Sequence, residues 1–180
     1  MLKIAITLPD AIDGEAAIIR RLLADGIDYV HLRKPHAGID YCRLLLSELT
    51  LAQRSRVVIH DYITLYEEFA LRGIHLSKNI THYYNGYHGS RTRSCHSLHE
   101  VAQYKDECDY LFLSPIFDSI SKCGYTSNFS HEELLSASKE GIIDNRVIAL
   151  GGITPDKIPY LASLHFGGVA MSGYLYRNVL

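Results

Sequence analysis

A turn that carries hydroxyl and ammonium groups follows an apolar run in the segment Asp109–Tyr125, which reads DYLFLSPIFDSISKCGY. The run Tyr110–Leu113 predicts a strand, and the turn after it contains Ser119, Ser121 and Lys122. A phosphate needs several hydrogen-bond donors and a positive charge, and these three side chains supply both. Ligands of α/β proteins bind where strands end, so this turn predicts an anion site. A surface loop can also hold Ser and Lys without a function.

Polar side chains and glycines also follow the other expected strands. In chain order these residues are His31, Arg33, Lys34, His60, Asp61, His75, Ser77, Ser94, His96, Ser114, Gly151, Gly152, Ser172 and Gly173. An arginine buried among strand ends is costly unless it meets an anion, so Arg33 predicts a phosphate contact. Gly151 and Gly152 precede an expected helix start, where backbone N–H groups and the helix dipole favour phosphate. The sequence therefore predicts two anion pockets, one at the seventh and eighth strands and one at the second and sixth.

Eight β-rich runs alternate with amphipathic stretches along the chain. The strands and helices that they form must position the polar side chains and glycines named above. The expected strands are Lys3–Leu8, Tyr29–Arg33, Arg56–Asp61, Ile74–Ser77, Thr92–His96, Tyr110–Leu113, Arg146–Leu150 and Gly168–Met171. The expected helices are Gly14–Ala24, Tyr41–Gln53, Thr64–Leu71, Leu98–Tyr104, His131–Lys139 and a segment capped by Thr154 that runs through Pro155 to about Leu164. The segment Asn79–Gly89 shows no clear period.

This order predicts one domain over residues 1–180, an α/β fold of the compact TIM (β/α)8 barrel type. The chain is shorter than the usual length of about 250 residues, so we expect the last helix to be short or missing. A doubly wound open sheet is the alternative, but closure removes the edges that an open sheet must protect. A missing last helix would leave an apolar flank on the first and eighth strands, which predicts a homodimer.

The composition indicates one soluble globular domain in a reducing, cytoplasmic setting. Of 180 residues, 47% are hydrophobic and 21% charged, and the net charge of −2 gives no basic field for nucleic acid or membrane. No apolar run approaches the roughly 18 residues that span a bilayer. The start MLKIAITLPD lacks the pattern of a signal peptide. Four scattered cysteines without a C-x-x-C pair favour a reducing compartment.

The motifs resemble, in order and spacing, those of the thiamine phosphate synthase superfamily, which also contains the thiazole tautomerase. They are HLRKP, VVIHD, GIHLS, SCHS, DYLFLSPIFDSISKCGY, VIALGGI and GVAMSG. The resemblance implies an enzyme of thiamine biosynthesis, a transferase that joins hydroxymethylpyrimidine diphosphate to thiazole phosphate and releases pyrophosphate with Mg²⁺. The implied roles are pyrophosphate contacts by Arg33, Ser119, Ser121 and Lys122, a magnesium ligand at Asp61, and a thiazole phosphate seat formed by Gly152 and the backbone around Met171 and Ser172.

Three departures from the synthase pattern bear on this implied site. Lys34 directly follows Arg33, one residue earlier than in the R-x-K pattern, and His60 replaces the usual Asn before Asp61. The loop after the fourth strand reads SKNI instead of carrying a second acidic ligand. Mg²⁺ can bind through one or two carboxylates plus substrate phosphates, so the metal site is weakened rather than excluded.

Other functions stay open at this point. A tautomerase-like isomerase needs a histidine on the sixth strand, where Pro115 stands, so His96, His60 or His31 would have to serve. A catalytically silent binder of a phosphorylated, thiamine-related ligand would keep the anion seats without the chemistry. A zinc site of His31, His60, His75 and His96 is disfavoured because zinc spacing motifs are absent.

Overall fold

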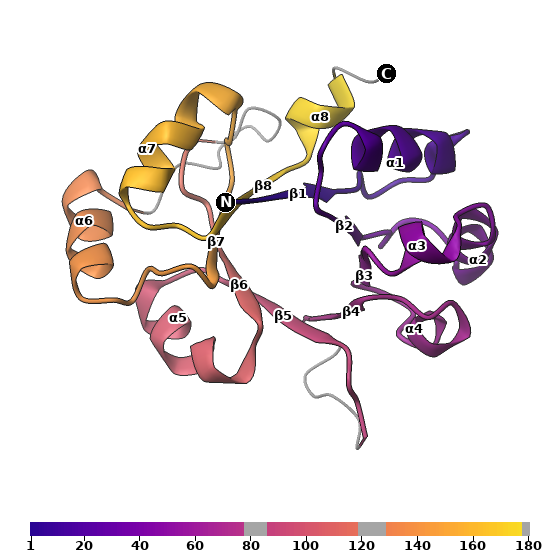
Figure 1. Ribbon diagram of the computed structural model, residues 1–180, viewed down its shortest axis with the longest axis horizontal. Coiled ribbons are helices and arrows are strands. Elements are labelled where there is room, and N and C mark those ends of the chain that lie inside the picture. The colour runs from indigo at the N-terminus through magenta and orange to yellow at the C-terminus, as the bar shows by residue number, and fades with distance from the viewer. Residues whose placement is uncertain (78–85, 119–128, 178–180) are drawn as a thin grey trace.

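The computed structural model describes residues 1–77, 86–118 and 129–177, and within them eight parallel strands close into a barrel in chain order. Helices surround these strands (Figure 1). The strands are β1 (Leu2–Ile6), β2 (Tyr29–Leu32), β3 (Val57–Ile59), β4 (Gly73–Leu76), β5 (Ser90–Cys95), β6 (Tyr110–Leu113), β7 (Val147–Leu150) and β8 (Gly168–Met171). The predicted (β/α)8 fold class is confirmed.

The helices lie between successive strands, as the alternation predicts. They are α1 (Glu15–Ala24), α2 (Ile39–Ser47), α3 (Leu51–Arg54), α4 (Leu65–Glu68), α5 (Leu98–Tyr104), α6 (His131–Lys139), α7 (Ile158–Ser163) and α8 (Gly173–Arg177), with 3-10 turns at Lys105–Glu107 and Pro155–Lys157. The expected short last helix is α8. It spans five residues and lies beside α1 at the end of the chain.

The expectation of one long helix over Tyr41–Gln53 is wrong, because the chain forms α2 and α3 there instead. Glu48 ends α2, and Thr50 begins α3 as an N-cap. The hydroxyl of Thr50 accepts from the backbone of Gln53, whose side chain accepts from the backbone of Thr50. This capping box satisfies two N–H groups and starts a new helix inside the apolar stretch.

Many other element bounds differ from the expectation by one or two residues, and three elements differ in a way that needs comment. The helix expected at Thr154 begins as the 3-10 turn, without a side-chain cap at Thr154, and α7 starts at Ile158 because Pro159 is tolerated only in a first turn. The fourth helix is only Leu65–Glu68, and Ala70 beyond it has a left-handed φ of 50°. The fifth strand lies at Ser90–Cys95, two residues earlier than expected at its start.

The interior of the barrel is apolar on one side and polar on the other. Ile4, Ile6, Tyr110, Phe112, Ile148 and Ala170 form the apolar group inside the barrel. His31, His75 and Thr92, on β2, β4 and β5, are buried polar side chains. Two larger apolar clusters lie between the strands and the helices, one in each half of the chain. These two clusters pack the helices against the strands. The polar side of the interior contains side chains that can bind a ligand or transfer a proton.

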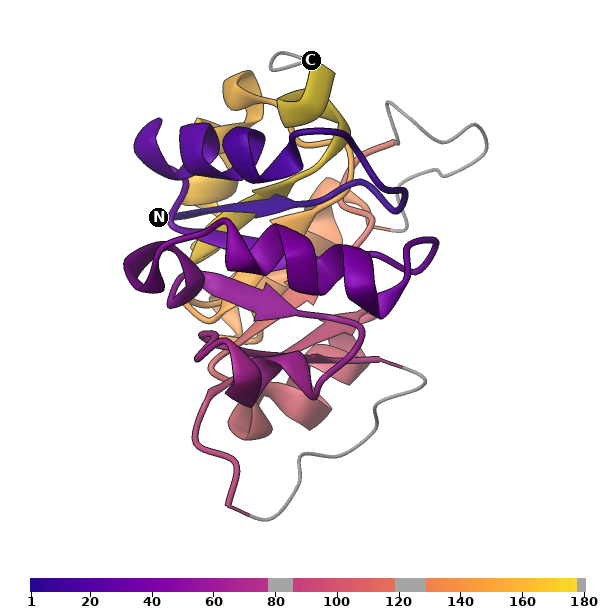
Figure 2. The same cartoon turned by 90° about the vertical axis from the view of Figure 1, so that its right-hand side faces the viewer.

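The expected apolar flank on β1 and β8 is wrong, because α8 covers it. Ala5 and Val169 are fully buried, and the Tyr176 side chain of α8 is 2% exposed. The Tyr176 hydroxyl donates to Oε1 of Glu15, the first residue of α1, at 2.7 Å. Figure 2 shows α8 beside α1 in the turned view as well. Among the described residues, no helix is long and apolar enough to cross a membrane.

Candidate active site

Arg33 lies directly beyond β2, where the loops of the carboxyl ends of the strands begin. Its backbone N–H donates to Thr7 Oγ1 at 2.9 Å, and the Thr7 hydroxyl donates to the Arg33 carbonyl at 3.0 Å. The arginine side chain is exposed, so it is not the buried charge that the sequence suggested. Thr7 follows β1 and was missed as a candidate, although a polar residue at a strand end is the signal used for the other strands. These two hydrogen bonds fix the backbone position from which the Arg33 side chain extends.

Lys34, the next residue, faces the opposite way and is fully buried. Its Nζ lies 2.6 Å from Glu15 Oε2 and donates to the Asp10 carbonyl at 2.7 Å. The hydroxyls of Tyr41 and Tyr176 donate to the two oxygens of Glu15, each at 2.7 Å. We call Glu15, Lys34, Tyr41 and Tyr176 the Glu15 network. The structure therefore engages the Lys34 ammonium with protein groups, outside the barrel and between α1, α2 and α8.

His31, His60 and His75 meet inside the barrel and form what we call the histidine cluster. They come from β2, from the end of β3 and from β4, and their ligand atoms lie within 4.8 Å of one another. His31 Nδ1 lies 2.8 Å from His60 Nε2, and the His60 and His75 rings are stacked with centroids 4.0 Å apart. His31 is fully buried, and His60 is 7% exposed. This cluster brings His60 together with two histidines that the sequence placed at neighbouring strand ends.

Hydroxyl groups hold the outer nitrogens of the histidine cluster. His31 Nε2 lies 2.6 Å from the Tyr110 hydroxyl. His75 Nδ1 lies 2.8 Å from Thr92 Oγ1, and its Nε2 lies 3.0 Å from Ser94 Oγ. The candidate residue Ser94 is therefore a partner of His75. Tyr110 and Thr92 were not singled out, because their role depends on which strands become neighbours across the barrel.

Burial lowers the pKa of all three histidines of the cluster. The pKa of His75 falls to about 3, first through desolvation and then through the charges of Arg33 and Arg93. The pKa of His60 lies well below 6.5, through desolvation, the two neighbouring histidines and Arg33. The pKa of His31 is lowered by desolvation, by His75 and by Arg72. Two of these neutral imidazoles, His60 and His75, therefore lie close enough to Arg33 to sense its charge.

Asp61, the predicted magnesium ligand, lies half-buried next to His60. Its Oδ2 accepts a hydrogen bond from the backbone N–H of Lys34 at 2.9 Å. In the part of the chain that the structure describes, Asp61 belongs to no group of three or more possible metal ligands. A single half-buried carboxylate fits Mg²⁺ only in the mode in which substrate phosphates and water complete the coordination.

His96 lies just beyond β5 and is exposed toward solvent. Its Nδ1 lies 3.0 Å from the Ser114 carbonyl, and its backbone N–H donates to Glu100 Oε2 at 2.6 Å. A carbonyl can only accept, so Nδ1 carries the proton and donates it, which leaves Nε2 as a hydrogen-bond acceptor. The structure thus orients His96 between the ends of β5 and β6.

Gly151 and Gly152 lie after β7, against the segment that leaves β6. Both have positive φ, 99° and 62°. A Cβ on Gly152 would lie 2.3 Å from the Asp118 carbonyl oxygen, and one on Gly151 would lie 2.8 Å from Pro115 Cα. Glycine is therefore required by the close approach of the β6 segment and by backbone conformation. The Lys157 ammonium donates to the Gly152 carbonyl at 2.6 Å.

The predicted thiazole phosphate seat lies within the described residues, and the predicted pyrophosphate turn lies outside them. Met171 ends β8 and is buried, and the Ser172 carbonyl accepts from the Tyr176 backbone N–H of α8 at 3.2 Å. Ser119, Ser121 and Lys122 lie outside the described residues, directly after Asp118. The structure thus brings Arg33 near the histidine cluster and Gly152 near the segment that leads into Ser119.

Comparisons with known proteins agree on one family. The family model described as thiamine monophosphate synthase matches residues 4–175. A curated thiamine-phosphate synthase of Bacteroides thetaiotaomicron is 25% identical over 167 residues, which cover 86% of this chain and 80% of that protein. The crystal structure of a thiamine phosphate pyrophosphorylase from Bacteroides thetaiotaomicron is 37% identical, with a TM-score of 0.89, over 98% of this chain and 85% of that one.

A more distant solved structure shares the fold. It is the thiamine phosphate pyrophosphorylase from Pyrococcus furiosus, which is 17% identical with a TM-score of 0.74. The match covers 95% of this chain and 85% of that chain.

Proposed function

The chain belongs to the thiamine monophosphate synthase family, and on this premise we propose that it joins hydroxymethylpyrimidine diphosphate to thiazole phosphate. As a member of this family it is a transferase with thiamine phosphate synthase-like function. In the proposed reaction, the bond between the pyrimidine methylene carbon and the diphosphate oxygen breaks. The same carbon forms a bond to the thiazole nitrogen, and pyrophosphate leaves.

The exposed guanidinium of Arg33 carries this proposal among the described residues. It extends from a backbone position fixed by Thr7, and its charge reaches His60 and His75. A free cation at the barrel mouth binds the diphosphate and stabilises the negative charge that develops as pyrophosphate leaves. Ser119, Ser121 and Lys122 complete this pyrophosphate grip in our proposal. Lys34 does not contribute its ammonium, because Glu15 and the Asp10 carbonyl engage it.

The remaining mouth residues bind and orient the two substrates in this proposal. His60 and Ser94 border the pyrimidine, and Gly151, Gly152, Met171 and Ser172 seat the thiazole phosphate through backbone N–H groups. His96 offers Nε2 as a proton acceptor, because Nδ1 donates to the Ser114 carbonyl. Asp61 would hold Mg²⁺ together with diphosphate oxygens, and the ion when bound neutralises charge on the leaving group.

Pyrophosphate release tests the proposal. The purified protein, incubated with both substrates and Mg²⁺, should release one pyrophosphate per thiamine phosphate formed. Arg33→Ala should lower kcat/KM about 10²-fold, the size expected for losing a donor to developing charge. Arg21→Ala is the matched control, because Arg21 is an exposed arginine on the outer face of α1. Equal activity of Arg33→Ala and Arg21→Ala would contradict the role of Arg33.

A tautomerase-like isomerase is the second candidate, and the orientation of His96 favours it. An acceptor at Nε2 suits a base that moves a proton within a carboxythiazole phosphate. Such an enzyme would turn over without Mg²⁺ and without the pyrimidine diphosphate, and it would lose activity in His96→Gln. Binding of both synthase substrates with no product in either assay would instead identify a silent binder.

We also propose one domain over residues 1–180 and a reducing, cytoplasmic compartment. Cys42, Cys95 and Cys108 are free and buried, and burial raises the pKa of the Cys95 thiol to about 12. Thiols kept reduced are typical of this compartment. A homodimer stays a prediction. Leu44 and Leu51, on α2 and α3, are exposed apolar side chains that a partner subunit could bury, and light scattering would test this.

A further inference from the structure

We propose that the histidine cluster is a binding site for a divalent transition metal of the zinc class, separate from the Mg²⁺ site. Among the residues that the structure describes, His31, His60 and His75 form the one group of three or more possible metal ligands. The proposal does not rest on the synthase reaction. It follows from the donor atoms, their spacing and the groups that hold them.

The donor set favours a transition metal over Mg²⁺. All three ligands are imidazole nitrogens, which suit Zn²⁺, Cu²⁺ or Ni²⁺, whereas Mg²⁺ prefers oxygen donors. A histidine binds metal in its neutral form, and these three side chains are buried in the barrel, where a charged ring is disfavoured. Neutral imidazoles therefore need not lose a proton to open the site.

The hydrogen bond between His31 and His60 marks where the ion would lie. Nδ1 of His31 and Nε2 of His60 are 2.8 Å apart and share one proton. A zinc ion with Zn–N bonds of about 2.0 Å holds two nitrogens about 3.3 Å apart in a tetrahedral site. When a metal ion takes both nitrogens, the shared proton moves to the other nitrogen of its own ring, so both imidazoles stay neutral, and the rings part by only about 0.5 Å.

Neighbouring hydroxyls supply the support that metal-bound histidines need. A ligating imidazole is oriented by a hydrogen bond at its second nitrogen. The Tyr110 hydroxyl lies 2.6 Å from His31 Nε2, which leaves Nδ1 for the metal. His75 is held by Thr92 at Nδ1 and by Ser94 at Nε2, so it keeps one partner when the other nitrogen turns to the ion.

The three ligands come from adjacent, rigid strands. His31 pairs in register with Val58 across β2 and β3, and Ile59 pairs with Ile74 across β3 and β4. His60 and His75 follow that last pair, which explains their stacking at 4.0 Å. Three protein ligands leave a fourth tetrahedral position for water or another small ligand, as in open zinc sites.

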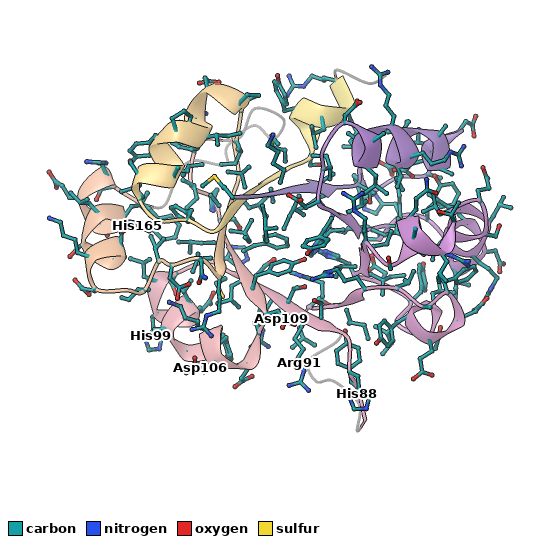
Figure 3. All side chains as sticks on the ribbon, viewed as in Figure 1. His88, Arg91, His99, Asp106, Asp109 and His165 are labelled. Carbon is teal, nitrogen blue, oxygen red and sulfur yellow. The ribbon has the colours of Figure 1, made fainter. Side chains whose placement is uncertain are left out.

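Metal stoichiometry on the full, tag-free chain tests the proposal. Protein stripped with a chelator is dialysed against Zn²⁺ in the presence of excess Mg²⁺, and bound zinc is measured by elemental analysis. We expect one Zn²⁺ per chain. His31→Gln and His75→Gln should each weaken zinc binding at least about 10-fold. His99→Gln is the matched control, because His99 lies on the outer helix α5 at the periphery of the molecule (Figure 3).

Two further measurements keep the test decisive if a histidine variant does not fold. Co²⁺ added to the wild-type protein should give the strong visible absorption of a tetrahedral site, and Zn²⁺ should abolish it. Tyr110→Phe, which removes only the hydroxyl beside His31, should weaken zinc binding about 10-fold. Absence of bound zinc, displacement by Mg²⁺, or undiminished binding in His75→Gln would each overturn the proposal.

Discussion

The histidine cluster and the Glu15 network are both buried and polar, but only the Glu15 network pairs opposite charges. Glu15 accepts from Tyr41 and Tyr176 and pairs with Lys34, whose ammonium also reaches the Asp10 carbonyl. Opposite charges are compensated there, and hydroxyls fill the remaining acceptor sites. The histidine cluster contains neutral imidazoles and borders the mouth. Its ring nitrogens are hydrogen-bonded as well, to one another and to hydroxyls, but these bonds are between neutral groups. Burial of polar groups therefore does not identify a binding site, and neutral donor atoms that can exchange a hydrogen bond for a ligand are the better sign.

The adjacent residues Arg33 and Lys34 show the same difference at the scale of two residues. Both were candidates because both follow the second strand. The structure exposes Arg33 at the mouth and buries Lys34 in the Glu15 network. The exposed guanidinium of Arg33 can contact a phosphate. The buried ammonium of Lys34 instead stabilises the fold by pairing with Glu15.

Removing the buried cation should have the largest effect on stability. Lys34→Met leaves the Glu15 carboxylate buried without its counter-charge, which costs about 3–5 kcal/mol of unfolding free energy. The measurement is urea unfolding at neutral pH. The control Arg21→Met, at an exposed pair, should change stability by no more than about 0.5 kcal/mol.

The double variant Lys34→Met with Glu15→Gln sharpens this prediction. It removes both charges, so most of the lost stability should return. If the single variant Lys34→Met costs less than about 1 kcal/mol, water reaches Glu15 and the network is not closed. The Glu15 network would then not differ from the histidine cluster in being a closed, charge-paired group.

The sequence predicted the barrel well because strand patterns are local. The bounds of β6, β8, α5 and α6 agree with the expectation residue by residue, since short apolar runs and cap residues fix them. The division at Thr50 was missed because a capping box there outweighs the continuous apolar face.

The site was harder to predict because it depends on neighbours across the barrel. The sequence placed His31, His60 and His75 at successive strand ends but not within 4.8 Å of one another. It also gave no sign that Lys34 would turn to Glu15, a partner 19 residues away on α1. Such pairings depend on strand register and on how helices dock, which a local pattern does not contain.

Acid should weaken the protein through the histidine cluster, by an intermediate amount for each pH unit. The folded-state pKa of His75 is about 3, below the unfolded value of 6.5, so stability is complete above about pH 6.5. As the pH falls from 6.5 toward 3, the unfolded chain binds a proton that the folded protein does not. His75 alone should therefore cost about 1.4 kcal/mol per pH unit over this range.

Urea unfolding of metal-free protein at several pH values measures this slope. His75→Gln should flatten it by about 1.4 kcal/mol per pH unit, with the exposed His99→Gln as reference. A slope unchanged in His75→Gln would mean that His75 takes up its proton in the folded state. The cluster would then not be a set of neutral imidazoles.

The smallest expected effect tests how far the Glu15 network extends. Tyr176→Phe removes one donor from Glu15 and leaves Lys34 and Tyr41 in place, so the charge stays compensated. The expected cost is about 1 kcal/mol in urea unfolding, with kcat/KM for pyrophosphate release unchanged. Asp61 accepts from the backbone of Lys34, so the network does touch the mouth at one point. A tenfold loss of kcat/KM with intact stability would show that the network also positions Asp61, and would remove the separation between a structural and a binding region.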